Sequence, residues 1–92
     1  MLIKVTAKHL AEGKRKNCEH CPIALAIKDV IIPGVEVTVV FAGVYFDMNT
    51  SWFFEPRPLG LVRERIQAFD RGGYVEPFDF EISIPEELCV SS

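Results

Sequence analysis

Two cysteines three residues apart, Cys18 and Cys21, are the residues whose types and spacing most directly allow chemistry. Pro22 follows them, a residue typical of a first helical turn, so Cys21 is expected at the start of a helix. The positive end of a helix dipole stabilises a thiolate and lowers the pKa of the thiol, which is how Cys-x-x-Cys oxidoreductases activate one sulfur. A thiol-active site at Cys18 and Cys21 is therefore one hypothesis.

The same two thiols have the spacing of half a zinc site. His9, His20 or Cys89 could complete a tetrahedron, but the chain has no second Cys-x-x-Cys motif. A third interpretation needs no reaction, because reduced cysteines are often buried and Cys21 precedes a run of apolar residues. We favour this packing interpretation and expect no cofactor and no metal, with Cys18 and Cys21 as the ligands to consider if a zinc ion stabilises the protein.

A basic loop at residues 13–17 leads into the same predicted helix. Its adjacent cations and the unpaired backbone N–H groups of a helix start together suit a phosphate or a carboxylate. We predict a site for a small, nucleotide-like anion, with the ligand-binding residues Lys14, Arg15, Lys16, Asn17 and Cys21. The alternative is a solvated turn, because exposed cations are common in loops and every helix starts with free donors.

Aromatic residues gather in a predicted hairpin that reverses at residues 47–50. They occupy both odd and even positions, so their rings point to both faces of a sheet. If helices cover one face, the other face is left for a partner or a ligand. We predict Tyr45, Trp52 and Phe54 as partner-binding residues, as in a protein–protein inhibitor, and core packing of these rings is the alternative.

The chain shows no residue pattern typical of an enzyme. His9 and His20 lie in or near the first two predicted helices, and neither has a neighbouring nucleophile and orienting acid in the sequence. The acidic residues at 79 and 81 alternate with apolar ones, which is typical of the solvated face of a strand. We therefore expect a non-catalytic protein.

Length and composition predict one domain over residues 1–92, since 92 residues with 49% hydrophobic content build a single core. No apolar run reaches the roughly 18 residues of a membrane span, and the first residues lack the pattern of a secretory leader. We expect a protein of the cytoplasm with no membrane partner.

The charge is distributed unevenly along the chain. The formal net charge is -3, but residues 1–31 hold six cations against three anions, so the remainder is acidic. Binding to extended nucleic acid needs a broad positive surface, which this balance does not supply. A small anion or a protein remains as the partner.

Periodicity and turn residues predict the element order β-α-α-β-β-α-β. The expected strands are residues 3–6, 35–41, 51–55 and 78–84, with Gly43 as a bulge, and the expected helices are residues 7–12, 22–31 and 59–71. Strands with one apolar face, interspersed with helices, are typical of an α+β fold. We predict a two-layer sandwich, with a mainly antiparallel sheet of about four strands and the helices on one face.

Two strings of residues resemble a group of small uncharacterised proteins from bacteriophages and prophages, over most of the chain outside the hairpin. The first is Gly13-Lys14-Arg15 with Cys18-x-x-Cys21-Pro22-Ile23-Ala24-Leu25-Ala26-Ile27. The second is Ile66-x-x-Phe69-Asp70-x-Gly72 with Val75-x-Pro77-Phe78-x-Phe80-Glu81. The resemblance implies an accessory binding protein in the cytoplasm of an infected bacterium, which sequesters a small ligand or blocks a host factor.

Overall fold

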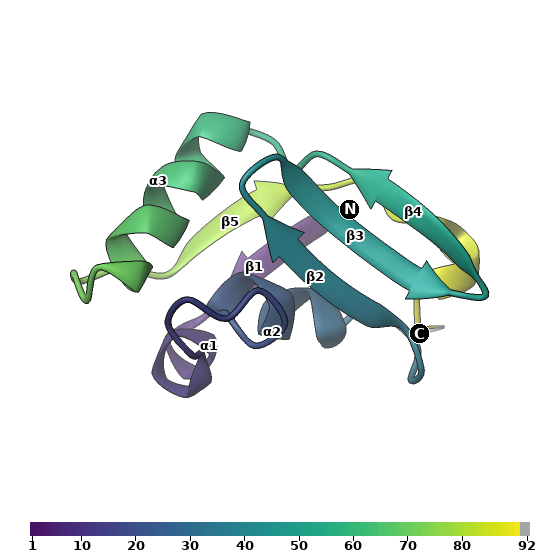
Figure 1. The fold of residues 1–92 in the computed structure, drawn as a ribbon, viewed down its shortest axis with the longest axis horizontal. Coiled ribbons are helices and arrows are strands. Elements are labelled where there is room, and N and C mark those ends of the chain that lie inside the picture. The colour runs from purple at the N-terminus through teal and green to yellow at the C-terminus, as the bar shows by residue number, and fades with distance from the viewer. Residues whose placement is uncertain (91–92) are drawn as a thin grey trace.

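Two antiparallel sheets form the framework of the protein, and the computed structural model describes residues 1–90 of the chain (Figure 1). The smaller sheet pairs the first and last strands, β1 (Leu2–Val5) and β5 (Phe78–Glu81). The larger sheet has the order β2-β3-β4, with the bounds Glu36–Val40, Gly43–Met48 and Thr50–Phe54. The helices are α1 (Ala7–Glu12), α2 (Pro22–Lys28), α3 (Leu59–Asp70) and a short 3-10 helix, η1 (Glu86–Leu88). The predicted α+β class and antiparallel pairing are confirmed.

The segment from residue 36 to residue 54 forms three strands, one more than the sequence predicted. The chain first reverses at residues 41–42, before the turn predicted at residues 47–50. A turn at residues 41–42 ends β2, and Gly43, which we expected as a bulge, begins β3. The segment 47–50, predicted as a turn, mostly belongs to β3 and β4, and only Asn49, at φ 63°, separates the two strands. The four strands expected in one sheet are therefore five strands in two sheets.

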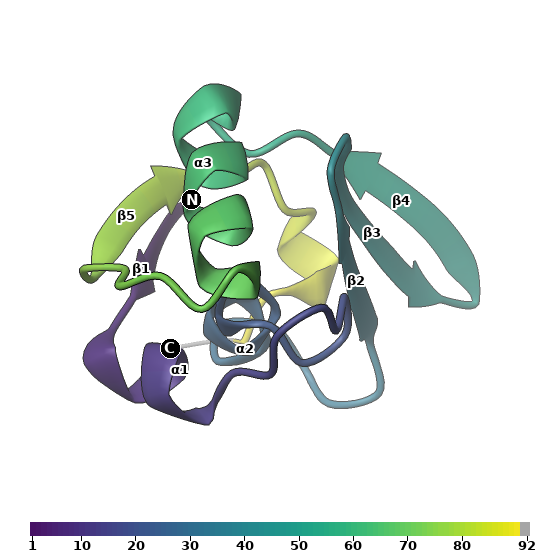
Figure 2. The same ribbon diagram turned by 60° about the vertical axis from the view of Figure 1, so that its left-hand side comes forward.

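The helices α2 and α3 lie between the two sheets (Figure 2), so the predicted arrangement with the helices on one face of a single sheet is not the one observed. α2 packs against β1 of one sheet and β2 of the other, and Figure 2 shows α2 and α3 in the space between the sheets. Most residues of α2 are small or apolar, and those buried include Ile23, Ala24, Ala26 and Ile27. Because alanine allows close approach of the backbones, α2 can join both sheets into one core.

Alternate residues of the strands supply the rest of this core. Fully or almost fully buried are Ile3 and Val5 in β1, Val37 and Val39 in β2, Val44 and Phe46 in β3, and Phe80 in β5. None of the helices within residues 1–90 has the length and apolar character needed to cross a bilayer.

The three-stranded sheet has one face on the core and one face open. In the pairing register, Thr38, Tyr45 and Phe53 form a row across the open face. No helix or strand of residues 1–90 lies over that face in either view (Figures 1 and 2). We refer to it as the open face.

Candidate binding surface

Two exposed aromatic side chains lie together on the open face, and a third, Phe41, is exposed at the turn between β2 and β3. Tyr45 and Phe53 pack against each other with their ring centroids 4.8 Å apart. The Phe53 ring extends over Gly43, toward the turn that carries Phe41. The exposed fractions are 55% for Phe41, 43% for Tyr45 and 41% for Phe53, which are high values for aromatic residues. We call Tyr45 and Phe53 the aromatic patch.

An arginine from α3 holds Phe41 at the turn between β2 and β3. The guanidinium carbon of Arg63 lies 4.3 Å from the centroid of the Phe41 ring, within the range of a cation–π interaction. Its Nε also donates a hydrogen bond to the Phe41 carbonyl oxygen over 2.7 Å. Arg63 therefore fixes the backbone and the ring of Phe41 together, so little conformational freedom remains to be lost on binding.

Carboxylates surround the aromatic patch. Glu36 and Asp47 lie opposite each other in the β2–β3 register, and Glu55 follows β4 at the same parity as Phe53. Asp47 accepts a hydrogen bond from the Ser51 hydroxyl. Within residues 1–90, no lysine or arginine forms a salt bridge with any of these three carboxylates. The open face therefore combines an apolar centre with an acidic rim.

The three predicted partner-binding residues fall on different faces. Tyr45 is exposed on the open face. Trp52 and Phe54 are half-buried and pack against the core, and the Phe54 ring lies 6.1 Å from the Phe46 ring. Phe53 is the exposed aromatic residue of β4, whereas we expected Trp52 and Phe54 to be exposed. The alternation in β4 could have shown this, because Trp52 and Phe54 share one parity and Phe53 has the other.

The basic loop is pinned to the end of α3. The Lys16 backbone N–H donates to Asp70 Oδ1 over 2.9 Å. The Arg15 guanidinium packs beside Gly72, where the last turn of α3 presents its carbonyl groups and a positive charge is favourable. Two of the cations predicted to bind an anion, Arg15 and Lys16, thus belong to a loop that is packed against the C-terminal end of α3.

The donors expected of the anion site are mostly engaged. Asn17 Oδ1 accepts hydrogen bonds from the backbone N–H groups of Glu19 and His20, both over 3.0 Å. At the start of α2, the Ala24 N–H donates to Cys21 Sγ over 3.4 Å, and Pro22 has no N–H. The start of α2 is therefore capped from within the chain.

Three of the predicted ligand-binding residues do line one groove. Lys16, Asn17 and Cys21 border a cavity of about 310 Å³ beside α3, together with Cys18 and Asp70. Lys14 and Arg15 do not border it. Because the Asp70 carboxylate faces this groove, its charge opposes an anion, and the anion site stays a prediction.

Burial, not activation, dominates the chemistry of Cys21. Burial raises the pKa of the Cys21 thiol, and the opposing effect of the backbone N–H groups of Ile23 and Ala24 is smaller. The N–H groups at the helix start do lower this pKa, as the thiol-active hypothesis requires, but burial outweighs them. Cys18 is exposed, and neither cysteine forms a disulfide within residues 1–90. The thiol-active hypothesis therefore lacks support at Cys21, because the pKa of this thiol is raised rather than lowered.

The zinc hypothesis lacks ligands in this structure. Among residues 1–90, no three His, Cys, Asp or Glu side chains come together in a group that could hold a metal ion. His20 lies beside Asn17, with its Nδ1 3.2 Å from Asn17 Oδ1. Neither Cys18 nor Cys21 therefore has the partners of a closed tetrahedral site.

Replacing Cys21 separates its capping role from its titration. Because the folded protein keeps the thiol protonated above the ordinary pKa of 9.0, the thiol's contribution to stability is full below about pH 9 and falls as pH rises. C21S replaces the capping sulfur by a capping oxygen and removes this decline, whereas C21A loses the cap and about 1 kcal/mol at neutral pH. Urea unfolding of the three proteins at about pH 7 and about pH 10 measures both effects. An equal alkaline decline in wild type and C21S would contradict this role.

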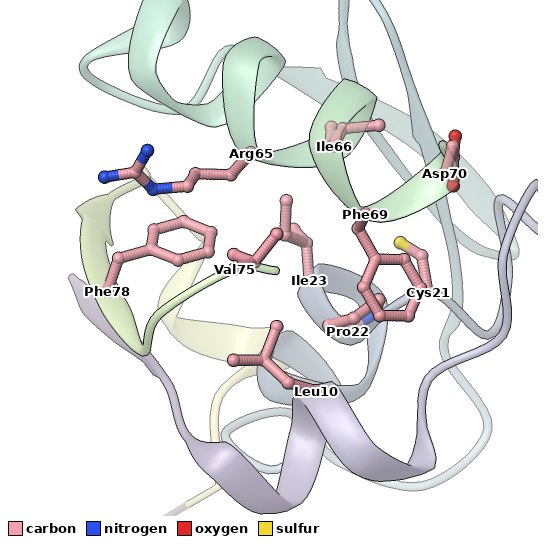
Figure 3. A pocket seen from close by; sticks show the side chains of 10 residues that line it. All are labelled: Leu10, Cys21, Pro22, Ile23, Arg65, Ile66, Phe69, Asp70, Val75 and Phe78. Atoms are coloured by element: carbon pink, nitrogen blue, oxygen red, sulfur yellow. The ribbon is translucent and has the colours of Figure 1, made fainter. Parts of the chain in front are cut away.

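The two strings of the phage resemblance meet around one small cavity (Figure 3). The side chains around it include Cys21, Pro22 and Ile23 from the first string, and Ile66, Phe69, Asp70, Val75 and Phe78 from the second. Its volume of about 10 Å³ is at the lower limit for one water molecule. The residues of the two strings therefore pack α3 against α2 and β5 and leave no room for a ligand.

Gly13, which begins the first string, is required by close packing. A Cβ at this position would lie 2.6 Å from two ring carbons of Pro22, which is too close for a real contact. G13A is therefore expected to destabilise the protein by about 1–3 kcal/mol, because the Pro22 ring belongs to the core and cannot move freely. Urea unfolding measures this loss. Unchanged stability would show that the loop and α2 do not pack as described.

His9 has a structural role that the sequence did not reveal. Its Nδ1 accepts a hydrogen bond from the Thr6 N–H over 3.0 Å, and its Nε2 lies 2.6 Å from Asp29 Oδ2. The Thr6 hydroxyl, the imidazole and the Asp29 carboxylate thus lie in line. Because the His9 Nδ1 already accepts a hydrogen bond from the Thr6 N–H, it is not free to take the proton of the Thr6 hydroxyl. The contacts of His9 with Thr6 and Asp29 instead connect the start of α1 to the end of α2. The spacing Thr6-x-x-His9 resembles a capping box and could have indicated this role.

Comparison with known proteins adds no family to this description. No family model, no curated protein and no solved structure matches the chain. The functional interpretation therefore depends on the geometry of the surface.

Proposed function

We propose that this protein is a non-catalytic accessory protein of phage type that captures a host protein on its open face. The observation that carries the proposal is the aromatic patch, in which the tilted rings of Tyr45 and Phe53 pack against each other while exposed. The resemblance supports the phage setting and the bacterial cytoplasm. Capture of this kind would block the host factor.

The shape and composition of the open face favour a macromolecule over a small ligand. Small ligands bind in concave sites that bury most of their surface, whereas the open face is the outside of a sheet. Tyrosine, phenylalanine and arginine are enriched at the centres of protein interfaces, where few residues supply most of the binding energy. The aromatic patch, a tyrosine beside a phenylalanine, has this composition.

The acidic rim specifies the chemistry of the partner. Glu36, Asp47 and Glu55 attract a surface that places lysine or arginine around an apolar centre. They repel the phosphates of nucleic acid. They also disfavour a second copy seated face to face, since like carboxylates would approach each other. We therefore propose a host protein with a basic rim around an apolar binding site.

Capture from a bacterial lysate with matched variants tests this function. Wild type, the double variant Y45A/F53A and the control Y74A are immobilised at equal density. Tyr74 is 84% exposed but lies outside the aromatic patch, so it controls for nonspecific adhesion of an exposed tyrosine. We expect a captured protein, identified by mass spectrometry, to bind Y74A as strongly as wild type and Y45A/F53A at least about tenfold more weakly.

Two outcomes would contradict the proposal. Equal capture by Y45A/F53A and wild type would place any interface elsewhere. Loss of capture in Y74A alone would move the interface to the loop after α3. Circular dichroism of each variant confirms that the fold is retained.

A further inference from the structure

The free edge of the larger sheet is formed by an uncharged strand. Within residues 1–90, β4 pairs with β3 and with no other segment. Its sequence, Thr-Ser-Trp-Phe-Phe, contains no charge, no proline and no glycine. Each of the other four strands carries at least one charged residue. β4 is therefore the strand best suited to pair with another chain.

The other sheet edges are protected, which makes β4 an exception. On the β2 edge, the Val39 N–H donates to the Cys18 carbonyl over 2.7 Å. On the β5 edge, the backbones of Arg57 and Glu81 exchange hydrogen bonds of 2.7 and 2.8 Å. β1 carries Lys4, and a lysine on an edge opposes pairing with other strands. An unprotected, aromatic-rich edge is a template on which another strand can pair.

We propose that β4 pairs in antiparallel fashion with β4 of a second copy, around a two-fold axis at Trp52. Trp52 is the middle residue of β4, so this register pairs all five residues of the strand. The two Trp52 side chains become a cross-strand pair, and Ser51 lies opposite Phe53 of the second copy. Asn49 then faces Glu55, so no two like charges are opposed.

The charge pattern selects this edge for self-association. Each copy has a formal net charge of -3, so two copies repel each other in general. Pairing through β4 brings the one uncharged strand of each copy together. The two-fold axis is perpendicular to the sheet, so both open faces lie on the same side. The resulting six-stranded sheet presents two aromatic patches side by side, and its formation does not depend on the host partner.

Analytical ultracentrifugation of the full chain tests this dimer. We compare wild type with S51K, which places a lysine on the β4 edge, and with T38K, which places one on the same face at β2. Concentrations run from about 5 µM to about 500 µM, because a short edge gives a weak interface. Trp52 is the only tryptophan, so its emission reports on the same contact.

The expected result is a dimer in wild type and T38K at high concentration, with a blue shift of Trp52 emission. S51K is expected to self-associate at least about tenfold more weakly, because the lysine must be placed against Phe53 of the second copy. A monomeric wild type at every concentration would overturn the proposal. Equal dimerisation of wild type and S51K would also overturn it, since the interface would then lie elsewhere. Circular dichroism verifies that S51K and T38K are folded.

Discussion

Replacing Phe46 by alanine is expected to remove about 3–5 kcal/mol of stability, a large share of the whole for a domain of this size. Phe46 is fully buried on the inner face of β3, among Val37, Val44 and Phe54. Truncation leaves a cavity that this packed centre cannot close. Urea unfolding followed by circular dichroism measures the loss.

Phe53→Ala is the matched control for Phe46→Ala, because the two rings belong to neighbouring strands of one sheet but to opposite faces. The Phe53 ring is exposed and loses mainly its contact with Tyr45, so we expect a cost of about 1 kcal/mol or less. Similar losses for the two variants would mean that the open face is part of a core.

Gly43 is the one glycine in the strands β2, β3 and β4, and Gly43→Ala is expected to destabilise the protein. A Cβ there would lie 2.7 Å from the Phe53 ring and 2.8 Å from the Phe54 carbonyl oxygen. The ring can move, but the carbonyl belongs to the paired strand, so strain of about 1–3 kcal/mol is expected. The displaced Phe53 ring would also disturb the aromatic patch.

Gly60→Ala provides the opposite control. Gly60 lies inside α3, and nothing is within 4 Å of the position that a Cβ would take. Alanine is therefore expected to stabilise the protein by about 0.5–1 kcal/mol through helix propensity. In thermal unfolding, we expect a lower Tm for G43A and a higher Tm for G60A than for wild type. A destabilised G60A together with an unaffected G43A would contradict the described packing.

Local patterns predicted the elements whose signals lie within a few residues. The alternation of Phe78 and Phe80 with acidic residues predicted β5, and Pro22 after Cys21 predicted the start of α2. The burial of Cys21 also agrees with the packing interpretation. These features depend on neighbours in the sequence, so periodicity and capping rules apply to them.

The turn between β2 and β3 could not be predicted in this way. Phe41 and Ala42 are not turn residues, and the turn is held instead by Arg63, which follows 22 residues later and donates to the Phe41 carbonyl. Because the turn was not predicted, β3 was not predicted either. The register that places Tyr45 beside Phe53 therefore could not be derived from the sequence.

The contacts of the basic loop could not be predicted for the same reason. Its three cations suit an anion locally, but the contact of Lys16 with Asp70 spans 54 residues of sequence. Partners at such separations depend on the topology, which the sequence pattern did not specify. The candidate surface thus became visible only when the sheets were assembled.

Hydroxyl-radical footprinting of the captured complex tests the open face most directly. In the free protein we expect labelling at Phe41, Tyr45, Phe53 and Tyr74, and little at the buried Phe46. In the complex, Tyr45 and Phe53 should lose their labelling while Tyr74 keeps it. Unchanged labelling of Tyr45 and Phe53 in the complex would contradict the claim that the open face binds the partner.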